Sequence, residues 1–295
     1  MNEIVIISGK GGTGKTTIVA SLAVLVKNKV IVDCDVDAAD LFLLIQPVTQ
    51  ERHEFWSGHK AVIDKDKCTQ CGLCQDLCRF NAINDFQVDT ISCEGCGFCY
   101  HVCPEEAIIM EENLSGSWFT ADTRYGPLVH AKLGIAQENS GKLVATVRQQ
   151  AKFIAEKKGV DYILSDGPPG IGCPVISSIS GVNLAVIVTE PTLSGIHDLD
   201  RAISVCQHFN VPVIVCINKY DLNEDNSHQI ENYCHSQRIE VASKIPFDNV
   251  VIEALVQGLP VVEYSSNNVT QQIKGLWEAI SRFLENKQGG ANANI

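Results

Sequence analysis

Eight cysteines within one stretch of 36 residues form two copies of the same pattern, C-x2-C-x2-C-x3-C. The first copy contains Cys68, Cys71, Cys74 and Cys78, and the second contains Cys93, Cys96, Cys99 and Cys103. Each cysteine of the second copy follows its counterpart by 25 positions, and Gly72 recurs as Gly97 at the same interval. This fixed period indicates an internal duplication.

The cysteine spacing is typical of [4Fe–4S] clusters, in which three thiolates on a tight loop bind three irons and the fourth thiolate comes from the other copy. The expected ligands are Cys68, Cys71, Cys74 and Cys103 for one cluster, and Cys78, Cys93, Cys96 and Cys99 for the other. Two zinc ribbons are the alternative, because C-x2-C is also zinc spacing. Zinc needs four ligands, however, and does not require the third and fourth cysteines of each copy at these intervals.

Roughly residues 60 to 112 resemble a bacterial two-cluster ferredoxin. Pro104 follows the last cysteine of the second copy, as in the ferredoxin pattern, whereas Arg79 stands at the equivalent place in the first. Arg79 removes no ligand, and its charge is expected either to shift the potential of one cluster or to contact a partner.

A second motif lies near the amino-terminal end. The apolar run 4–7 predicts a buried parallel strand, and an apolar helical stretch follows at 18–26. The segment 9–17 between them matches the phosphate loop G-x4-G-K-[ST] in its strand–loop–helix setting. A glycine-rich turn that happens to carry a lysine is the alternative.

In such a loop the backbone amides bind phosphate, Lys15 reaches the outer phosphates and Thr16 binds Mg²⁺. The expected nucleotide-binding residues are Gly11, Gly12, Thr13, Gly14, Lys15, Thr16 and Thr17.

The string KGGTGKTT contains an additional lysine, Lys10, and resembles the deviant phosphate loop of the MinD/ParA/Mrp and nitrogenase iron-protein group of ATPases. The resemblance implies ATP as ligand and a homodimer in which Lys10 crosses to the nucleotide of the other subunit, as arginine fingers do elsewhere. The alternative for Lys10 is an exposed charge without this role.

Aspartates at the ends of two predicted strands extend this site, because the carboxyl ends of parallel strands face the ligand crevice. In the family, the aspartate matching Asp35 orients or deprotonates the attacking water, so Lys10, Lys15 and Asp35 are the expected catalytic residues. Asp166 resembles the Walker B aspartate, and the Gly-Pro-rich turn after it resembles a nucleotide-sensing switch. The expected Mg²⁺ residues are Thr16, Asp35 and Asp166.

Three further aspartates, Asp33, Asp37 and Asp40, are expected to cap a helix that starts near Ala38.

Base recognition has two interpretations. Asn218-Lys219-Tyr220-Asp221 matches the N-K-x-D string of guanine-binding proteins, where the aspartate pairs with the base. In the MinD/Mrp group the same strand end supplies the asparagine to adenine, and a later loop, here with Pro246, packs on the base. Asn218, Lys219 and Pro246 are therefore expected at the base, and Lys10 favours ATP over GTP.

Strands predicted near 3–8, 30–33, 161–165, 183–188, 212–217 and 240–245 alternate with helices. This pattern predicts an α/β fold with a doubly wound, mostly parallel sheet, into which a small α+β ferredoxin-type domain is inserted. The expected boundaries are 1–59 and 113–288 for the nucleotide-binding domain, 60–112 for the insert and 289–295 for a flexible tail.

Two segments are harder to assign. The stretch 118–137 has no clear pattern, and 126–130 is interpreted as a loop near the switch or the clusters. A helix expected at 269–287 has one apolar face and is predicted to close the sheet. The alternative, a membrane-targeting helix, is not favoured because its polar face lacks a basic excess.

The net charge of −12 and an aromatic content of 6% argue against binding to nucleic acid or an anionic membrane. The first residues show no signal peptide, and no apolar run approaches the roughly 20 residues of a membrane span. A cytoplasmic location is therefore expected, where cysteines bind metals more often than they form disulfides.

Five cysteines lie outside the duplication. Cys34, Cys206, Cys216 and Cys234 are expected to be packing residues. Cys173 follows the switch turn, which in relatives faces the twofold axis, and an additional redox or metal role stays open for it.

The leading hypothesis is an ATPase homodimer that couples ATP to iron–sulfur or metallocofactor assembly on a client protein. The alternatives are an ATP-driven electron donor resembling nitrogenase iron protein, with a redox partner protein, a positioning ATPase, and a GTPase metallochaperone.

Overall fold

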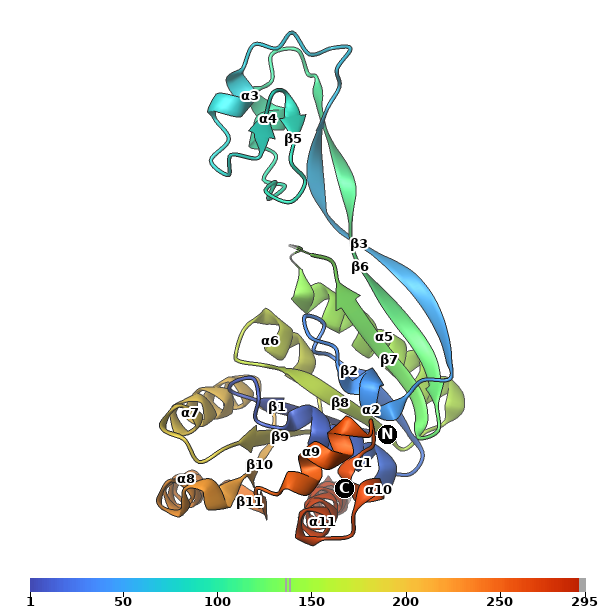
Figure 1. The fold of residues 1–295 in the computed structure, drawn as a ribbon, viewed down its shortest axis with the longest axis vertical. Coiled ribbons are helices and arrows are strands. Elements are labelled where there is room, and N and C mark those ends of the chain that lie inside the picture. The colour runs from blue at the N-terminus through green and yellow to red at the C-terminus, as the bar shows by residue number, and fades with distance from the viewer. Residues whose placement is uncertain (136, 138, 292–295) are drawn as a thin grey trace. The chain divides into compact units, whose positions relative to one another are not determined.

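The computed structural model describes residues 1–135, 137 and 139–291 (Figure 1). Within them, one sheet has nine strands in the order β11-β10-β9-β1-β8-β2-β7-β6-β3, and β4 and β5 form a separate pair. The strands are β1 (Asn2–Ser8), β2 (Lys29–Asp33), β3 (Thr49–Ile63), β4 (Ile83–Asn84), β5 (Gln87–Val88), β6 (Ile108–Thr123), β7 (Gly126–Leu133), β8 (Tyr162–Pro169), β9 (Leu184–Thr189), β10 (Val213–Asn218) and β11 (Glu240–Ile245).

The helices complete the fold. They are α1 (Lys15–Leu25), α2 (Leu41–Ile45), α3 (Leu73–Asp76), α4 (Phe98–Val102), α5 (Ser140–Lys158), α6 (Cys173–Ile179), α7 (Leu193–His208), α8 (Glu224–Ser236), α9 (Asn249–Val256), α10 (Val261–Tyr264) and α11 (Asn268–Ala291), with a 3-10 turn η1 (Tyr220–Leu222).

The chain divides into two compact units. Unit 1 contains residues 1–52, 119–131 and 141–295, and unit 2 contains residues 53–118 and 132–140. The predicted insert, 60–112, lies entirely within unit 2.

Unit 1 is a sheet with helices on both faces (Figure 1). Alternate residues of β1 point to opposite faces, so Ile4 and Ile6 join one core while Val5 and Ile7 join the other. Helices α1, α2, α10 and α11 contribute to the first core, and α6, α7 and α8 to the second. All recorded pairings among β1, β2 and β7 to β11 are parallel, which confirms the predicted mostly parallel α/β fold.

Three strands of the sheet were not predicted. The expected loop at 126–130 is wrong, because this segment belongs to β7 and pairs with β2. His130 of β7 is buried between the rings of Phe42 and Phe119, at centroid distances of 5.9 and 4.8 Å. β3 and β6 carry many polar residues, so their sequences lack the apolar run that marked the buried strands.

Two helix boundaries also differ from expectation. α2 begins at Leu41 rather than near Ala38, and its first residue donates its amide to Asp33 Oδ2 at 3.2 Å, whereas Asp40 at the N-cap position makes no side-chain capping bond. α11 packs on the sheet as predicted and continues to Ala291, so it includes part of the expected tail. Residues 292–295 lie outside the described residues.

Candidate functional site

The phosphate loop forms the turn between β1 and α1, and its shape requires glycine. Gly12 and Gly14 have φ angles of 78° and 88°, in the left-handed region that side chains disfavour. A Cβ on Gly14 would also collide with the side-chain amide of Asn218. Because α1 begins at Lys15, the unpaired amides of its first turn border the loop and favour an anion there.

A pocket of about 400 Å³ opens beside this loop and contains most of the predicted nucleotide-binding residues. Those that line it are Gly12, Gly14, Lys15, Thr16, Thr17, Asn218, Lys219 and Pro246. Gly11 and Thr13 do not line it, although the Thr13 carbonyl accepts a hydrogen bond from Asn218 Nδ2 at 2.8 Å. Part of the lining is apolar and includes Val251, Ile252 and Leu255.

The Asp221 carboxylate, the guanine-binding candidate, is not among the residues that line this pocket. Its Oδ1 accepts the amide of Phe247 at 2.7 Å and so holds the loop after β11. Asp248, which does line the pocket, accepts from Val250 N at 2.9 Å and from Asn267 Nδ2 at 2.8 Å. Both carboxylates therefore stabilise the chain around the pocket.

Lys10 lies on the other side of the loop and contacts its own chain. Its Nζ lies 2.6 Å from Glu190 Oε1 and 3.1 Å from both Thr192 Oγ1 and Ser194 Oγ. Lys219 binds the other oxygen of Glu190 at 3.2 Å and the Gly12 carbonyl at 3.2 Å. Burial alone would raise the pKa of Glu190. The hydrogen bonds and charges of Lys10 and Lys219 outweigh it, so that the pKa lies below its ordinary value.

Glu190 is a site residue that the sequence analysis missed. It directly follows β9, at the same carboxyl edge of the sheet as the predicted aspartates. The position at the end of an apolar strand was an available signal, but a lone glutamate without a motif did not stand out.

Three aspartates lie close together at the end of β2 and within the neighbouring strand β8. Asp33 and Asp166 are register partners on these strands and both are buried. Burial raises the pKa of Asp33 well above its usual range, and the nearby Asp166 raises it further. Its Oδ1 accepts the Asp35 amide at 3.0 Å, so Asp33 shapes the loop that carries Asp35.

Asp166 and Asp35 both lie near the phosphate loop. Burial raises the pKa of Asp166 to about 6, while the Lys15 ammonium and a hydrogen bond from the Thr16 side chain oppose the rise. Burial also raises the pKa of Asp35, and Lys15 again opposes it. Asp166 Oδ1 is buried and has no hydrogen-bond partner among the described residues. A carboxylate oxygen in this position beside a threonine hydroxyl fits the oxygen ligands that Mg²⁺ prefers.

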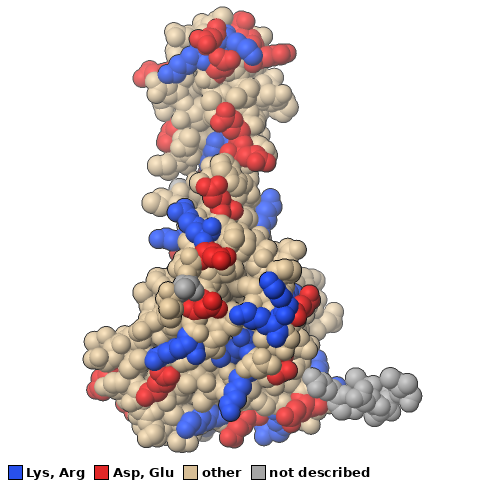
Figure 2. Space-filling model, turned by 90° about the vertical axis from the view of Figure 1, so that its right-hand side faces the viewer, with Lys and Arg blue, Asp and Glu red and all other residues tan. Residues whose placement is uncertain are grey.

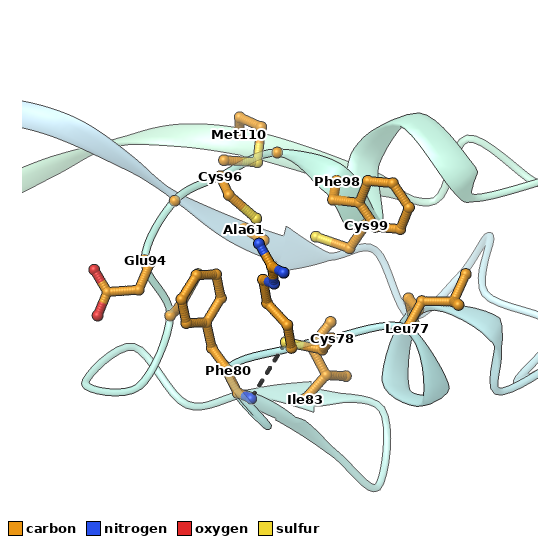
Figure 3. A pocket seen from close by; sticks show the side chains of 16 residues that line it. Ala61, Leu77, Cys78, Phe80, Ile83, Glu94, Cys96, Phe98, Cys99 and Met110 are labelled. Atoms are coloured by element: carbon orange, nitrogen blue, oxygen red, sulfur yellow. Dashed lines mark hydrogen bonds between the residues drawn. The ribbon is translucent and has the colours of Figure 1, made fainter.

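In unit 2, the eight duplicated cysteines surround two pockets. Site A, a small pocket of about 20 Å³, is lined by Cys68, Cys71, Cys74 and Cys103. Site B, a larger pocket of about 560 Å³, is lined by Cys78, Cys93, Cys96 and Cys99, and Cys74 borders it as well. Figure 3 shows Cys78, Cys96 and Cys99 around the space of site B.

The fourth cysteine of each copy has the same local contact. Cys78 Sγ accepts the Ala82 amide at 3.4 Å, and Cys103 Sγ accepts the Ala107 amide at 3.3 Å. Burial raises the pKa of Cys74 and of Cys99, and neighbouring cysteines contribute to both shifts. Among the described residues, no three donor side chains converge as the ligands of a single ion would. In a [4Fe–4S] cube each thiolate binds a different iron, so its four sulfurs need not converge in that way.

The remaining cysteines divide as the sequence suggested. Cys34, Cys206, Cys216 and Cys234 are buried. Burial raises the pKa of Cys206 and Cys216 to about 12 and that of Cys234 to about 11, so these thiols are unreactive. Cys173 is exposed at the first residue of α6, after the positive-φ Gly170.

In the part of the chain that the structure describes, no helix has the length and apolar character of a membrane span. Acidic and basic side chains are interspersed over the face shown in Figure 2.

Comparison with known proteins places this geometry in a family. The model of the CobQ/CobB/MinD/ParA nucleotide binding domain matches residues 4–261. An uncharacterised protein of Methanocaldococcus jannaschii is 34% identical over 285 residues, 96% of this chain and 97% of that protein. An iron-sulfur cluster carrier protein of Pyrococcus abyssi is 24% identical over 163 residues, 50% of this chain and 55% of that protein.

Among solved structures, the septum site-determining protein MinD of Pyrococcus horikoshii in complex with Mg-ADP superimposes with a TM-score of 0.57. The match covers 100% of this chain and 99% of that one at 20% identity, so it shows a shared fold alone. From the family match over most of its length, the chain belongs to the CobQ/CobB/MinD/ParA nucleotide-binding domain family.

Proposed function

We propose that this protein is an ATP-hydrolysing homodimer that carries two [4Fe–4S] clusters and couples the nucleotide to iron–sulfur or metallocofactor assembly on a client protein. The observation that carries the proposal is the pairing of a phosphate-loop pocket in unit 1 with eight cysteines that line two pockets in unit 2. The partial likeness to an iron-sulfur cluster carrier protein supports the assembly role.

The nucleotide in this proposal is Mg-ATP. Thr16 and Asp166 would hold the ion, since Asp166 offers a buried oxygen without a hydrogen-bond partner among the described residues. Mg²⁺ supplies charge neutralisation between the phosphates when bound. Asp35 is placed on the loop after β2 and is our candidate for orienting the attacking water.

Adenine is favoured over guanine. Guanine recognition through N-K-x-D needs a free carboxylate facing the base, and the Asp221 oxygen Oδ1 is already bonded to Phe247. The pocket instead offers apolar contact from Pro246, Val251 and Ile252, together with the Asn218 side chain. Such apolar side chains can pack on the face of a purine base, and this packing does not require a carboxylate at the edge of the base.

Lys10 connects the nucleotide site to dimerisation in this proposal. Within one chain it is bound to Glu190, Thr192 and Ser194 and does not line the nucleotide pocket. To reach the nucleotide of a second subunit it must leave these partners. The Glu190 contact would therefore hold Lys10 back until the dimer forms, where Lys10 would stabilise charge on the transferred phosphate.

The cysteine pockets suit iron–sulfur clusters in their donor chemistry. Sites A and B each gather four thiols from both copies of the repeat, and each contains a sulfur that accepts a backbone amide. Amide bonds to sulfur are among the features that tune such clusters. When bound, the clusters would supply one-electron redox chemistry or a transferable iron–sulfur unit.

A second candidate function is ATP-driven electron donation to a redox partner. It is favoured because each of the two sites contains all four of its expected cysteine ligands. Four cysteines of the same chain surround each site, so neither cluster needs a ligand from elsewhere. A cluster held in that way is suited to remain in place while electrons pass.

One experiment separates the two functions. The protein is purified anaerobically, and its iron and sulfide are counted before and after incubation with an apo-acceptor protein and ATP, ADP or no nucleotide. Loss of iron to the acceptor only with ATP supports assembly. About eight irons that stay bound in every condition would exclude the carrier version and leave electron donation. A Lys15→Ala variant, which lacks the phosphate-binding ammonium, should lose the ATP response while retaining its iron.

A further inference from the structure

The two cysteine pockets are related by the internal repeat, yet the residues around them differ in charge. Position 79 of the first copy corresponds to position 104 of the second, and the two positions line different pockets. Site B is lined there by Arg79, whereas site A is lined by Pro104. The next pair also differs, since site B has Phe80 and site A has Glu105.

Among the residues that line the pockets, one further charge offsets this difference in part. Site B is also lined by Glu94, whose counterpart in site A is the neutral Thr69. The lining of site B thus carries one cation and one carboxylate, while that of site A carries one carboxylate. Site B is therefore the more positive of the two by one charge.

Two other features that tune a cluster are similar at the two sites. The amide-to-sulfur hydrogen bonds measure 3.4 Å at Cys78 in site B and 3.3 Å at Cys103 in site A. Cys71 and Cys96, at corresponding positions, are both exposed. Because these amide-to-sulfur hydrogen bonds are similar, the charge of the lining residues is one of the differences that remain, together with the larger volume of site B and the burial of individual cysteines.

We propose that Arg79 makes the two sites unequal, so that the first electron accepted by the protein resides at site B. This inference rests on the proposed presence of the clusters. An added electron makes either site more negative, and the Arg79 guanidinium stabilises that charge at site B while Glu105 opposes it at site A. A one-electron reductant supplies the electron, and no bond is made or broken.

In this proposal Arg79 does not bind a cluster iron. It determines at which of the two sites the added electron resides. Site A, with the lower reduction potential, would pass an electron on to site B. Arg79, Phe80 and Phe98 are exposed around site B, so the electron would leave through that face.

The test is a redox titration of the full-length protein, purified anaerobically and followed by electron paramagnetic resonance. Arg79→Gln should lower the higher of the two midpoint potentials and reduce the preference of the electron for that site about fivefold, or about 40 mV for a one-electron couple. Glu105→Gln should instead raise the lower midpoint potential. Lys132→Gln removes a charge of unit 2 that lines neither pocket and is the matched control.

The outcomes are distinguishable. Narrowing of the gap by both variants, from opposite ends, supports the inference. If Arg79→Gln moves the lower potential, or moves neither potential more than Lys132→Gln does, the inference is overturned even with about eight irons present. If Arg79→Gln does not fold, Glu105→Gln still tests the order of the two sites, because a rise of the higher midpoint potential in that variant would overturn the inference. Iron far below that content in the wild-type protein would contradict the proposed function and this inference together.

Discussion

The buried ion pair between Glu3 and Arg148 is expected to contribute strongly to the free energy of unfolding of unit 1, and this contribution can be measured. Arg148 of α5 donates from Nε to Glu3 Oε1 at 2.8 Å, and its other nitrogens donate to the carbonyls of Ser177 and, at 2.9 Å, Ser180. Its side chain is 8% exposed and that of Glu3 is 5% exposed. One guanidinium therefore joins the start of β1 to the last turn of α6.

The perturbation is Arg148→Met, which keeps the apolar stem and removes the donors. It leaves the buried Glu3 carboxylate with Lys152 as its remaining cation, at 3.0 Å, and leaves two carbonyls at the end of α6 without these donors. Removing one member of a buried pair costs about 3–5 kcal/mol, so we expect the free energy of unfolding of unit 1 to fall by about 4 kcal/mol.

Lys152→Met is the matched control, because it removes the second cation from the same carboxylate. The Lys152 side chain is 42% exposed, so solvent already screens its contact with Glu3 and the loss should stay below about 1 kcal/mol. The double change Glu3→Met with Arg148→Met removes both buried charges and should cost clearly less than Arg148→Met alone.

The assay is urea denaturation followed by far-ultraviolet circular dichroism, with hydrogen exchange to localise the effect. In Arg148→Met, the Ser180 amide, which bonds to the Ile176 carbonyl, should exchange faster than in the wild type. Equal losses in Arg148→Met and Lys152→Met, or no recovery in the double variant, would refute the argument from burial.

Three further predictions concern the nucleotide site and its surroundings. Gly14→Ala should weaken ATP binding more than about tenfold by calorimetry, because its left-handed φ and the neighbouring amide disfavour a Cβ. Gly11→Ala should weaken binding less, because a Cβ there meets no atom of the chain within 4 Å. Burial lowers the pKa of His130 to about 4, so below pH 6.5 the unfolded chain binds a proton that the folded chain does not, and stability should decline by about 3 kcal/mol as the pH falls from 6.5 to 4. His130→Phe should remove that decline in urea denaturation, and an unchanged pH profile would contradict the assignment. Glu190→Gln should let the dimer form at about tenfold lower concentration of a non-hydrolysable ATP analogue in sedimentation experiments, since it weakens the hold on Lys10 within the chain. Dimerisation that requires the same or a higher concentration would argue against this restraint.

The parts of the fold that were predictable from sequence are those encoded by neighbouring residues. All six predicted strands are present, and five of them contain a short apolar run, as a strand covered on both faces requires. The sixth, β11, lies at the edge of the sheet and has a mixed sequence. β7 was interpreted as a loop because Gly126 and Pro127 begin it, and these residues usually mark turns. Only its pairing with β2 makes the segment a strand.

In the candidate site too, the features set by neighbouring residues were predictable, and those set by distant contacts were not. The phosphate loop and the cysteine repeat were visible because their residues stand at short, fixed intervals. Asp33 accepts the amide of Leu41, the first residue of α2, as a capping residue would, whereas Asp40 makes no such bond. Which aspartate does so depends on how the chain turns after β2, where Asp33 also accepts the Asp35 amide.

By itself the sequence determined the family of the nucleotide loop, the duplicated cysteine pattern and the alternation of strands and helices, because each is a local pattern of residue types. The tertiary structure decided which distant residues meet. It brought Glu190 to Lys10, Asp221 to the amide of Phe247, and Arg148 to Glu3. The two residues of each pair are 26 to 180 positions apart in the sequence. Such pairs depend on the order of strands in the sheet, which no single stretch of sequence encodes.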